Sequence, residues 1–216
     1  MTKHKSTFLM KIHKRILVAG GLVLPVQTYA HHVTGGQRPQ TFEEGLLSGL
    51  AHPVIGLDHF LFLLMAGVLA YSLQSPSRYV LPALVVASAL FGTSLHLAEI
   101  SVPRAEILIT LSVIVSGGLV WSQRRVGAAI LSLFFAGAGV FHGYAYAESV
   151  IGGETTPLVA YLIGLALIQF AVMAGAMICL GKLYGLTKQT YAVGAERFAG
   201  VAALGGGAVI LALSFS

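Results

Sequence analysis

The sequence predicts an all-α polytopic membrane protein, a six-transmembrane-helix bundle that remains after removal of an N-terminal signal peptide. Hydrophobic residues make up 56% of the 216-residue chain, charged residues make up only 10%, and the mean hydropathy is +0.83. A water-soluble domain of this length carries more charge, so the lipid bilayer is the expected solvent. The pattern of the first thirty residues and the spacing of the apolar runs after them complete the prediction.

Residues 1–30 have the order of a secretory signal peptide. Five of the thirteen basic residues fall within the first fifteen positions, an apolar stretch covers 16–26, and Thr28-Tyr29-Ala30 closes the segment. The apolar stretch has about eleven residues, whereas a transmembrane helix needs roughly 20. We therefore predict cleavage after Ala30, which leaves 31–216 as a single transmembrane domain.

Six apolar runs long enough to span a bilayer follow, each bounded by polar, Pro or Gly residues. They lie near 53–73, 79–98, 105–121, 126–146, 157–180 and 197–215. A short interfacial helix at 42–50 is expected before them, because two glutamates precede three leucines there.

The basic residues of the predicted loops orient the chain. With the mature N-terminus outside, the cytoplasmic connections are 74–78, 122–125 and 181–197, and they hold six basic residues, whereas the outside segments hold Arg38 and Arg104. This asymmetry follows the positive-inside rule. The predicted location is therefore a bacterial plasma membrane, with both termini outside the cytoplasm.

The charge of the chain does not indicate a nucleic-acid partner. The formal net charge is +5, but removing the first fifteen residues leaves eight basic residues against eight acidic ones, with no basic groove or aromatic stacking surface. The single cysteine, Cys179, excludes an intramolecular disulfide and a thiolate metal cluster. The expected partners are the lipid bilayer and a metal ion, and a homo-oligomer is left open.

Every acidic residue and histidine near a span is expected toward one membrane face, the outer one. His52 opens the first span, and the other candidates are Asp58 and His59 about two turns further in, His96 and Glu99 at the end of the second span, Glu106 at the start of the third, and His142 and Glu148 at the end of the fourth. Ionisable groups at the bilayer centre cost about 2.5–3.5 kcal/mol each, so they usually pair or line a pathway. We expect a metal site that forms an outward-facing mouth.

The last two spans are expected to be scaffold, because Gln169 is their one strongly polar side chain.

Imidazole nitrogens with carboxylate oxygens suit nickel, cobalt, zinc, copper or iron. Pro53 places His52 at the helix entrance, with Gly56 allowing a neighbour to approach closely. Asp58 and His59 point about 100° apart, so one is expected to be a ligand and the other to orient it, and the sequence does not decide which.

The stretch His52-Pro53-Val54-Ile55-Gly56-Leu57-Asp58-His59 resembles the signature of the HupE/UreJ family of nickel and cobalt permeases. Two further features support the resemblance: Pro103–Glu106 opens the third span with Ser112 and Gly117 following, and Phe141-His142-Gly143 stands before Glu148. The resemblance covers essentially the whole mature chain. It implies secondary uptake of nickel or cobalt, with zinc a weaker alternative, and no catalytic cofactor. It assigns a metal role to His52, Asp58 and His59, and more loosely to Glu106, His142 and Glu148.

This chain departs from the family pattern in the fourth span. Family members often read Phe-His-Gly-His-Ala-His there, whereas Tyr144 and Tyr146 follow His142 in this sequence. A protonated phenol is a poor ligand for these ions, so the second part of the site is expected to be weaker or differently selective. His96 and Glu99 are three residues apart, hence neighbours on a helix, and are candidates to supply the missing ligands.

Two other functional classes compete with a permease. An intramembrane zinc-dependent hydrolase needs a closed set of three protein ligands, and the sequence has no His-Glu-x-x-His or comparable motif. A non-transporting accessory subunit would use the polar cluster only to stabilise the bundle, and the small-residue pattern of Gly139 and Gly143 fits either class. We predict a transporter and not an enzyme.

Overall fold

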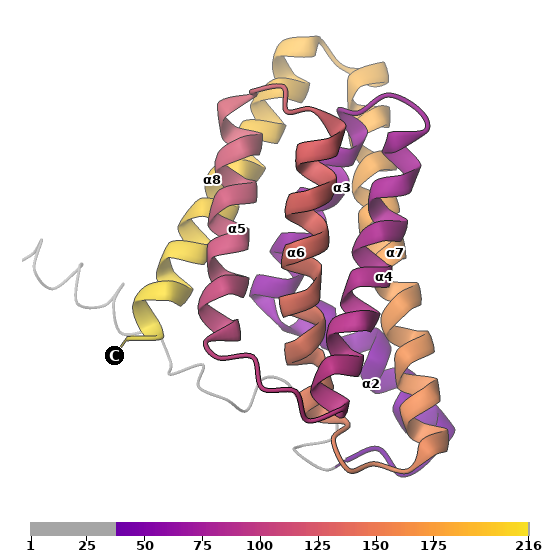
Figure 1. Cartoon of the computed structure of the whole chain (residues 1–216). Coiled ribbons are helices and arrows are strands. Elements are labelled where there is room, and N and C mark those ends of the chain that lie inside the picture. Colours follow the sequence, from indigo (N-terminus) through magenta and orange to yellow (C-terminus); the bar gives the residue numbers. More distant parts are fainter. Residues whose placement is uncertain (1–37, 216) are drawn as a thin grey trace, which may run out of the picture. The chain divides into compact units, whose positions relative to one another are not determined.

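The computed structural model describes residues 38–215, and that part of the chain is helical with short connections. The helices are α2 (Phe42–Ile55), α3 (Leu57–Tyr71), α4 (Ser77–Leu97), α5 (Ala105–Ser122), α6 (Ala128–Tyr146), the short 3₁₀ helix η1 (Ala147–Ser149), α7 (Thr155–Leu186) and α8 (Gln189–Leu213) (Figure 1). The predicted all-α membrane fold is confirmed. The predicted signal peptide and its cleavage site lie outside the described residues.

The helices α4 to α8 are each long and apolar enough to cross a bilayer. The helices α2 and α3 pass the same test only as a pair, and the pair is bent by 78° at the break between them. Residues 38–215 therefore contain five candidate spans by length and composition, or six if the bent pair is one broken span.

The prediction of one continuous helix from 53 to 73, opened by His52 and Pro53, is wrong. The helix expected at 42–50 instead continues through Pro53 to Ile55, and the break falls at Gly56 (φ −70°, ψ 106°). Pro53 has no N–H to donate to the carbonyl four residues before it, and its ring crowds that carbonyl, so the helix is weakened there and ends two residues later at Ile55. His52 consequently lies in the last turn of one helix, while Asp58 and His59 lie in the first turn of the next.

The N-terminus of α2 explains why this segment forms a stable helix before the first span. Thr41 Oγ1 accepts a hydrogen bond from Glu44 N at 3.2 Å, and Glu44 Oε2 accepts one from Gln40 N at 2.7 Å. These two bonds resemble a capping box, and Glu43 adds a second negative charge at the positive end of the helix dipole.

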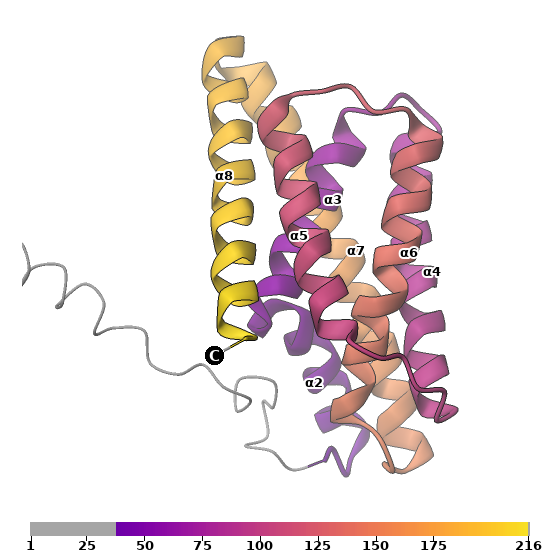
Figure 2. The same cartoon turned by 60° about the vertical axis from the view of Figure 1, so that its left-hand side comes forward.

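Three helix pairs account for the closest packing: α2 with α7, α4 with α6, and α5 with α8 (Figure 2). The helix α3 contacts a member of each pair. Its buried residues Phe62, Leu63, Met65 and Ala66 belong to the larger apolar core. Because α3 begins just after Gly56 and lies among the other helices, its first turn carries His59 into the interior of the bundle.

The pair α4 and α6 depends on a glycine next to His142. A Cβ atom on Gly143 would collide with the backbone carbonyl of Ala89, and Thr93 Oγ1 bridges the same two helices, 2.8 Å from Gly143 O and 3.0 Å from Ala89 O. Any larger residue at position 143 therefore forces the helices apart.

We predict that Gly143→Ala lowers the free energy of unfolding by about 1–3 kcal/mol, the usual range for overpacking a close contact. Thermal unfolding of the detergent-purified protein measures this change. Gly137→Ala is the matched control on the same helix, because a Cβ atom there meets nothing within 4 Å. Equal melting temperatures for the two variants would contradict the predicted packing.

The length of the connection expected at 181–197 is also wrong. The helix α7 extends to Leu186 and α8 starts at Gln189, which leaves two residues between them. Glu196 therefore lies on α8, where its carboxylate accepts a hydrogen bond from Gln123 Nε2 at 2.9 Å, at the C-terminal end of α5. The expectation that every acidic residue near a span lies at one face fails for Glu196, because Glu106 occupies the opposite end of α5.

Candidate metal centre

The break between α2 and α3 brings two histidines together in the interior. His52 lies in the last turn of α2 and His59 in the first turn of α3, and their ring centroids are 6.0 Å apart. Each side chain is only 3% exposed. Gly56 sits between them, and a Cβ atom there would lie 2.7 Å from His59 Cδ2. The sequence-based expectation of an open mouth is not met, because these rings are buried.

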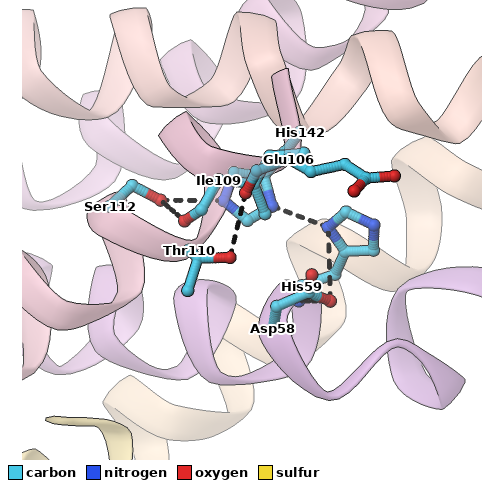
Figure 3. A network of polar contacts seen from close by, with 7 residues as sticks. All are labelled: Asp58, His59, Glu106, Ile109, Thr110, Ser112 and His142. Atoms are coloured by element: carbon cyan, nitrogen blue, oxygen red, sulfur yellow. Dashed lines mark hydrogen bonds and ion pairs between the residues drawn. The ribbon is translucent and has the colours of Figure 1, made fainter. Parts of the chain in front are cut away.

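His142 on α6 completes the group. Its Nδ1 atom lies 2.7 Å from His59 Nδ1, and Phe62 stacks on its ring with centroids 3.9 Å apart. Figure 3 shows the two imidazoles facing one another, with Ser112 of α5 on the far side of His142. The group therefore contains three buried histidines from three different helices, α2, α3 and α6, and we name His52, His59 and His142 the histidine cluster.

The hydrogen bonds assign the proton of His142. Ser112 Oγ donates its one proton to Ile109 O at 2.6 Å, so it accepts from His142 Nε2–H at 2.9 Å. This tautomer leaves the lone pair of His142 on Nδ1, where it accepts from Nδ1–H of His59. The two rings share one proton between them at the centre of the cluster.

A second hydrogen-bond network orients His52. Tyr161 Oη on α7 donates to Tyr146 O at 2.7 Å and lies 3.0 Å from His52 Nδ1, while Ser149 Oγ donates to the same carbonyl at 3.1 Å and lies 3.3 Å from Nδ1. Both hydroxyls have given their proton to the carbonyl, so they accept from His52 Nδ1–H. The lone pair of His52 is then on Nε2, a nitrogen through which neutral imidazoles bind metals.

The close packing of α2 on α7 places Tyr161 beside His52. A Cβ atom on Gly49 would collide with the carbonyl of Tyr161, and one on Gly164 would lie 2.5 Å from Leu46 O. Two glycines thus allow the helix backbones to touch. The helix α7 contributes directly to the site, so the prediction that it is only scaffold is wrong.

We predict that Tyr161→Phe lowers the free energy of unfolding by about 1 kcal/mol, the typical contribution of one hydrogen bond. The substitution removes the hydroxyl that links Tyr146 O with His52 Nδ1 and keeps the ring. Chemical denaturation of the purified protein is the measurement. An unfolding midpoint equal to that of the wild type would show that the link does not stabilise the fold.

Asp58 lies beside the histidine cluster without being buried in it. Its side chain is 21% exposed, its Oδ1 atom accepts from His59 N at 2.8 Å, and Oδ1 is 4.0 Å from His59 Nδ1. A carboxylate in the first turn of α3 is stabilised by the helix dipole. The structure thus places His59 against His142, and Asp58 where its charge acts on His59.

The other predicted residues lie outside the cluster. His96 Nδ1 bonds Tyr144 O at 2.7 Å, and its ring stacks on Tyr144 with centroids 4.0 Å apart. Glu106 enters the network of Figure 3 through its backbone carbonyl, which accepts from Thr110 Oγ1 at 2.9 Å. The carboxylates of Glu99, Glu106 and Glu148 are exposed. Glu99 follows the C-terminal end of α4, Glu106 lies in the first turn of α5, and Glu148 lies in η1. These helix ends are on the same side of the bundle as the cluster.

In the described part of the chain, no three His, Cys, Asp or Glu side chains are arranged to hold one ion as they stand. The spacing of His59 and His142 nevertheless suits shared binding. Imidazole–metal bonds are about 2.0–2.1 Å long, so two such ligands at a right angle lie about 3 Å apart. The observed 2.7 Å between the Nδ1 atoms is a few tenths of an ångström shorter. An ion between the two Nδ1 atoms would require a small separation of the rings and a shift of the His59 proton from Nδ1 to Nε2, which leaves both imidazoles neutral.

Sequence reasoning missed Tyr161 and Ser149 as neighbours of His52, and Ser112 as the partner of His142. Hydroxyl groups in apolar runs are a weak signal, because most of them bond their own helix. These three hydroxyls differ from the others because each also contacts a histidine on another helix. Only the folded chain shows these contacts.

Comparisons with known proteins agree with the features described above. The family described as HupE / UreJ protein matches residues 19–210. The chain is 26% identical over 199 residues to Protein HupE of Rhizobium leguminosarum bv. viciae, an alignment that covers 91% of this chain and 100% of that protein. No solved structure matches the chain significantly.

Proposed function

Because this chain belongs to the HupE/UreJ family, we propose that it is a secondary permease for nickel, cobalt or both, and that the histidine cluster is its metal-binding site. The observation that carries the proposal is the meeting of three buried histidines from three helices inside an apolar bundle. Polar and ionisable groups at such positions are costly and usually serve transport.

The exposed carboxylates complete the proposed path. Glu99, Glu106 and Glu148 lie at the end of α4, the start of α5 and in η1, and His142 lies near the C-terminal end of α6, just before η1. We propose that this end of the bundle faces outward and that its negative charges attract the cation before it reaches the buried cluster. The membrane is the bacterial plasma membrane, and both termini lie outside the cytoplasm.

The broken first span supports transport over a purely structural role. Transporters use discontinuous helices to place helix ends and side chains at a binding site within the membrane. Here α2 ends and α3 begins beside the cluster, with a 78° bend between them. A purely structural role for this helix pair does not explain why the break lies between two buried histidines.

The test is metal influx into liposomes that contain the purified protein, measured with radioactive nickel and cobalt and with zinc and magnesium as comparison ions. We expect saturable influx of nickel, cobalt or both, above that of protein-free liposomes, and no magnesium influx. Absence of nickel and cobalt influx from correctly folded protein would contradict the proposal and favour an accessory or hydrolytic role.

A further inference from the structure

One hydroxyl at the histidine cluster has no role in the interactions described so far. Among the buried side-chain polar atoms of residues 38–215, Tyr146 Oη alone has no hydrogen-bond partner. The Tyr146 side chain is fully buried, with 0% exposure. Leaving a buried hydroxyl unsatisfied costs about 1–3 kcal/mol, so such a group in a native protein needs a specific reason.

Tyr146 lies against two members of the histidine cluster and shares a helix face with the third. Its ring centroid is 4.4 Å from that of His59 and 5.4 Å from that of His52. Tyr146 is four residues after His142, so the two side chains lie on the same face of α6. The unpartnered hydroxyl therefore belongs to a residue surrounded by the candidate metal ligands.

The backbone of Tyr146 is held firmly while its hydroxyl is not. Its carbonyl accepts from both Tyr161 Oη at 2.7 Å and Ser149 Oγ at 3.1 Å. Packing alone does not explain a tyrosine here, because phenylalanine would fill the same space beside the imidazoles without burying an unsatisfied oxygen.

We infer that the Tyr146 hydroxyl recognises the transported cation through a water molecule that the cation carries. This inference rests on the proposed function. A neutral phenol is a poor direct ligand for nickel or cobalt, but its oxygen accepts hydrogen bonds well. Water on a divalent cation is a strong hydrogen-bond donor, because the ion polarises it. The cation thus enters the cluster partly hydrated, with imidazoles replacing only some of its water.

Partial hydration also agrees with the number of protein ligands. The described residues offer no set of three His, Cys, Asp or Glu side chains arranged around one point, which leaves coordination positions for water on an ion bound between His59 and His142. A site that keeps water on its cargo binds it less tightly and releases it more readily, which transport requires.

Tyr146→Phe tests the inference because it removes the hydroxyl alone. Calorimetric titration of the detergent-purified protein with nickel chloride or cobalt chloride gives the Kd, and thermal unfolding in a chelator gives the stability without metal. We expect the Kd to rise about tenfold, as for loss of a hydrogen bond to a charged partner. We also expect the metal-free melting temperature to stay the same or rise, because the unsatisfied oxygen is gone.

Tyr144→Phe is the matched control, two residues away on the same helix. The Tyr144 hydroxyl accepts from Val102 N at 3.3 Å, outside the histidine cluster, so its loss should leave the Kd unchanged. A wild-type Kd in Tyr146→Phe would overturn the inference, and so would a lower metal-free melting temperature, since it would reveal a structural bond. Failure of the wild type itself to bind nickel and cobalt would instead reject the proposed function.

Discussion

Nickel or cobalt influx into liposomes is expected to fall by about 100-fold or more when either His59 or His142 is replaced with alanine, because each supplies a ligand of the proposed ion. The two Nδ1 atoms are 2.7 Å apart, so removing one ring leaves the other without its partner at the binding position. The initial rate of influx at a fixed metal concentration is the measurement.

His96→Ala is the matched control for these two variants. His96 lies at the end of α4 and pairs with Tyr144, not with the cluster, so we expect influx of the folded variant within about twofold of the wild type. A loss of influx in His96→Ala as large as in His142→Ala would mean that the path runs through His96. Melting temperatures of all three variants separate transport defects from misfolding.

Gly56→Ala is expected to reduce influx about tenfold or more, because it disturbs the break that places His59. The backbone of Gly56 has φ −70° and ψ 106°, which alanine adopts without strain, so the effect comes from the added Cβ atom alone. That atom would lie 2.7 Å from His59 Cδ2 and would push the imidazole away from His142. The measurement is again the initial rate of influx.

Gly127→Ala provides a closely matched control. Gly127 precedes α6 as Gly56 precedes α3, with similar extended backbone angles of φ −63° and ψ 147°, but a Cβ atom there meets nothing within 4 Å. Its influx should equal that of the wild type. If both glycine variants behaved alike, the position of the His59 ring would not depend on the space beside Gly56.

The residues of the first predicted span show which features of the site could be predicted from the sequence. The motif from His52 to His59 marked the candidate metal site, because ionisable groups inside an apolar run are rare enough to be informative. The shape of the segment was mispredicted. Pro53 was assigned to the start of a helix, where proline is most common, whereas it lies in the last turn of α2 and the chain breaks at Gly56. The start of a helix suits proline, whereas in α2 Pro53 leaves one backbone carbonyl without its usual partner, and the close packing of α2 on α7 outweighs this local cost.

In the fourth span, the sequence indicated a candidate residue but not its contacts. His142 was a candidate on the strength of its position, but neither its contact with His59 nor its bond to Ser112 follows from spacing along the chain. His96 and Glu99 were expected to replace the missing imidazoles because they are neighbours on a helix. In the structure His96 stacks on Tyr144 instead. Sequence spacing shows that two residues lie on the same face of a helix, but the packing of the helices decides which neighbour that face contacts.

The sequence by itself determined the solvent, the helical class and the residue types of the site. A chain that is 56% hydrophobic and 10% charged has too few polar groups to cover itself in water, and helices satisfy their own backbone hydrogen bonds in lipid. Only the tertiary structure decided that His52, His59 and His142 meet, that they are buried, and that Tyr146 lies among them with an unsatisfied hydroxyl. The reason is that periodicity describes each helix alone, whereas a metal site depends on where glycines let different helices approach one another.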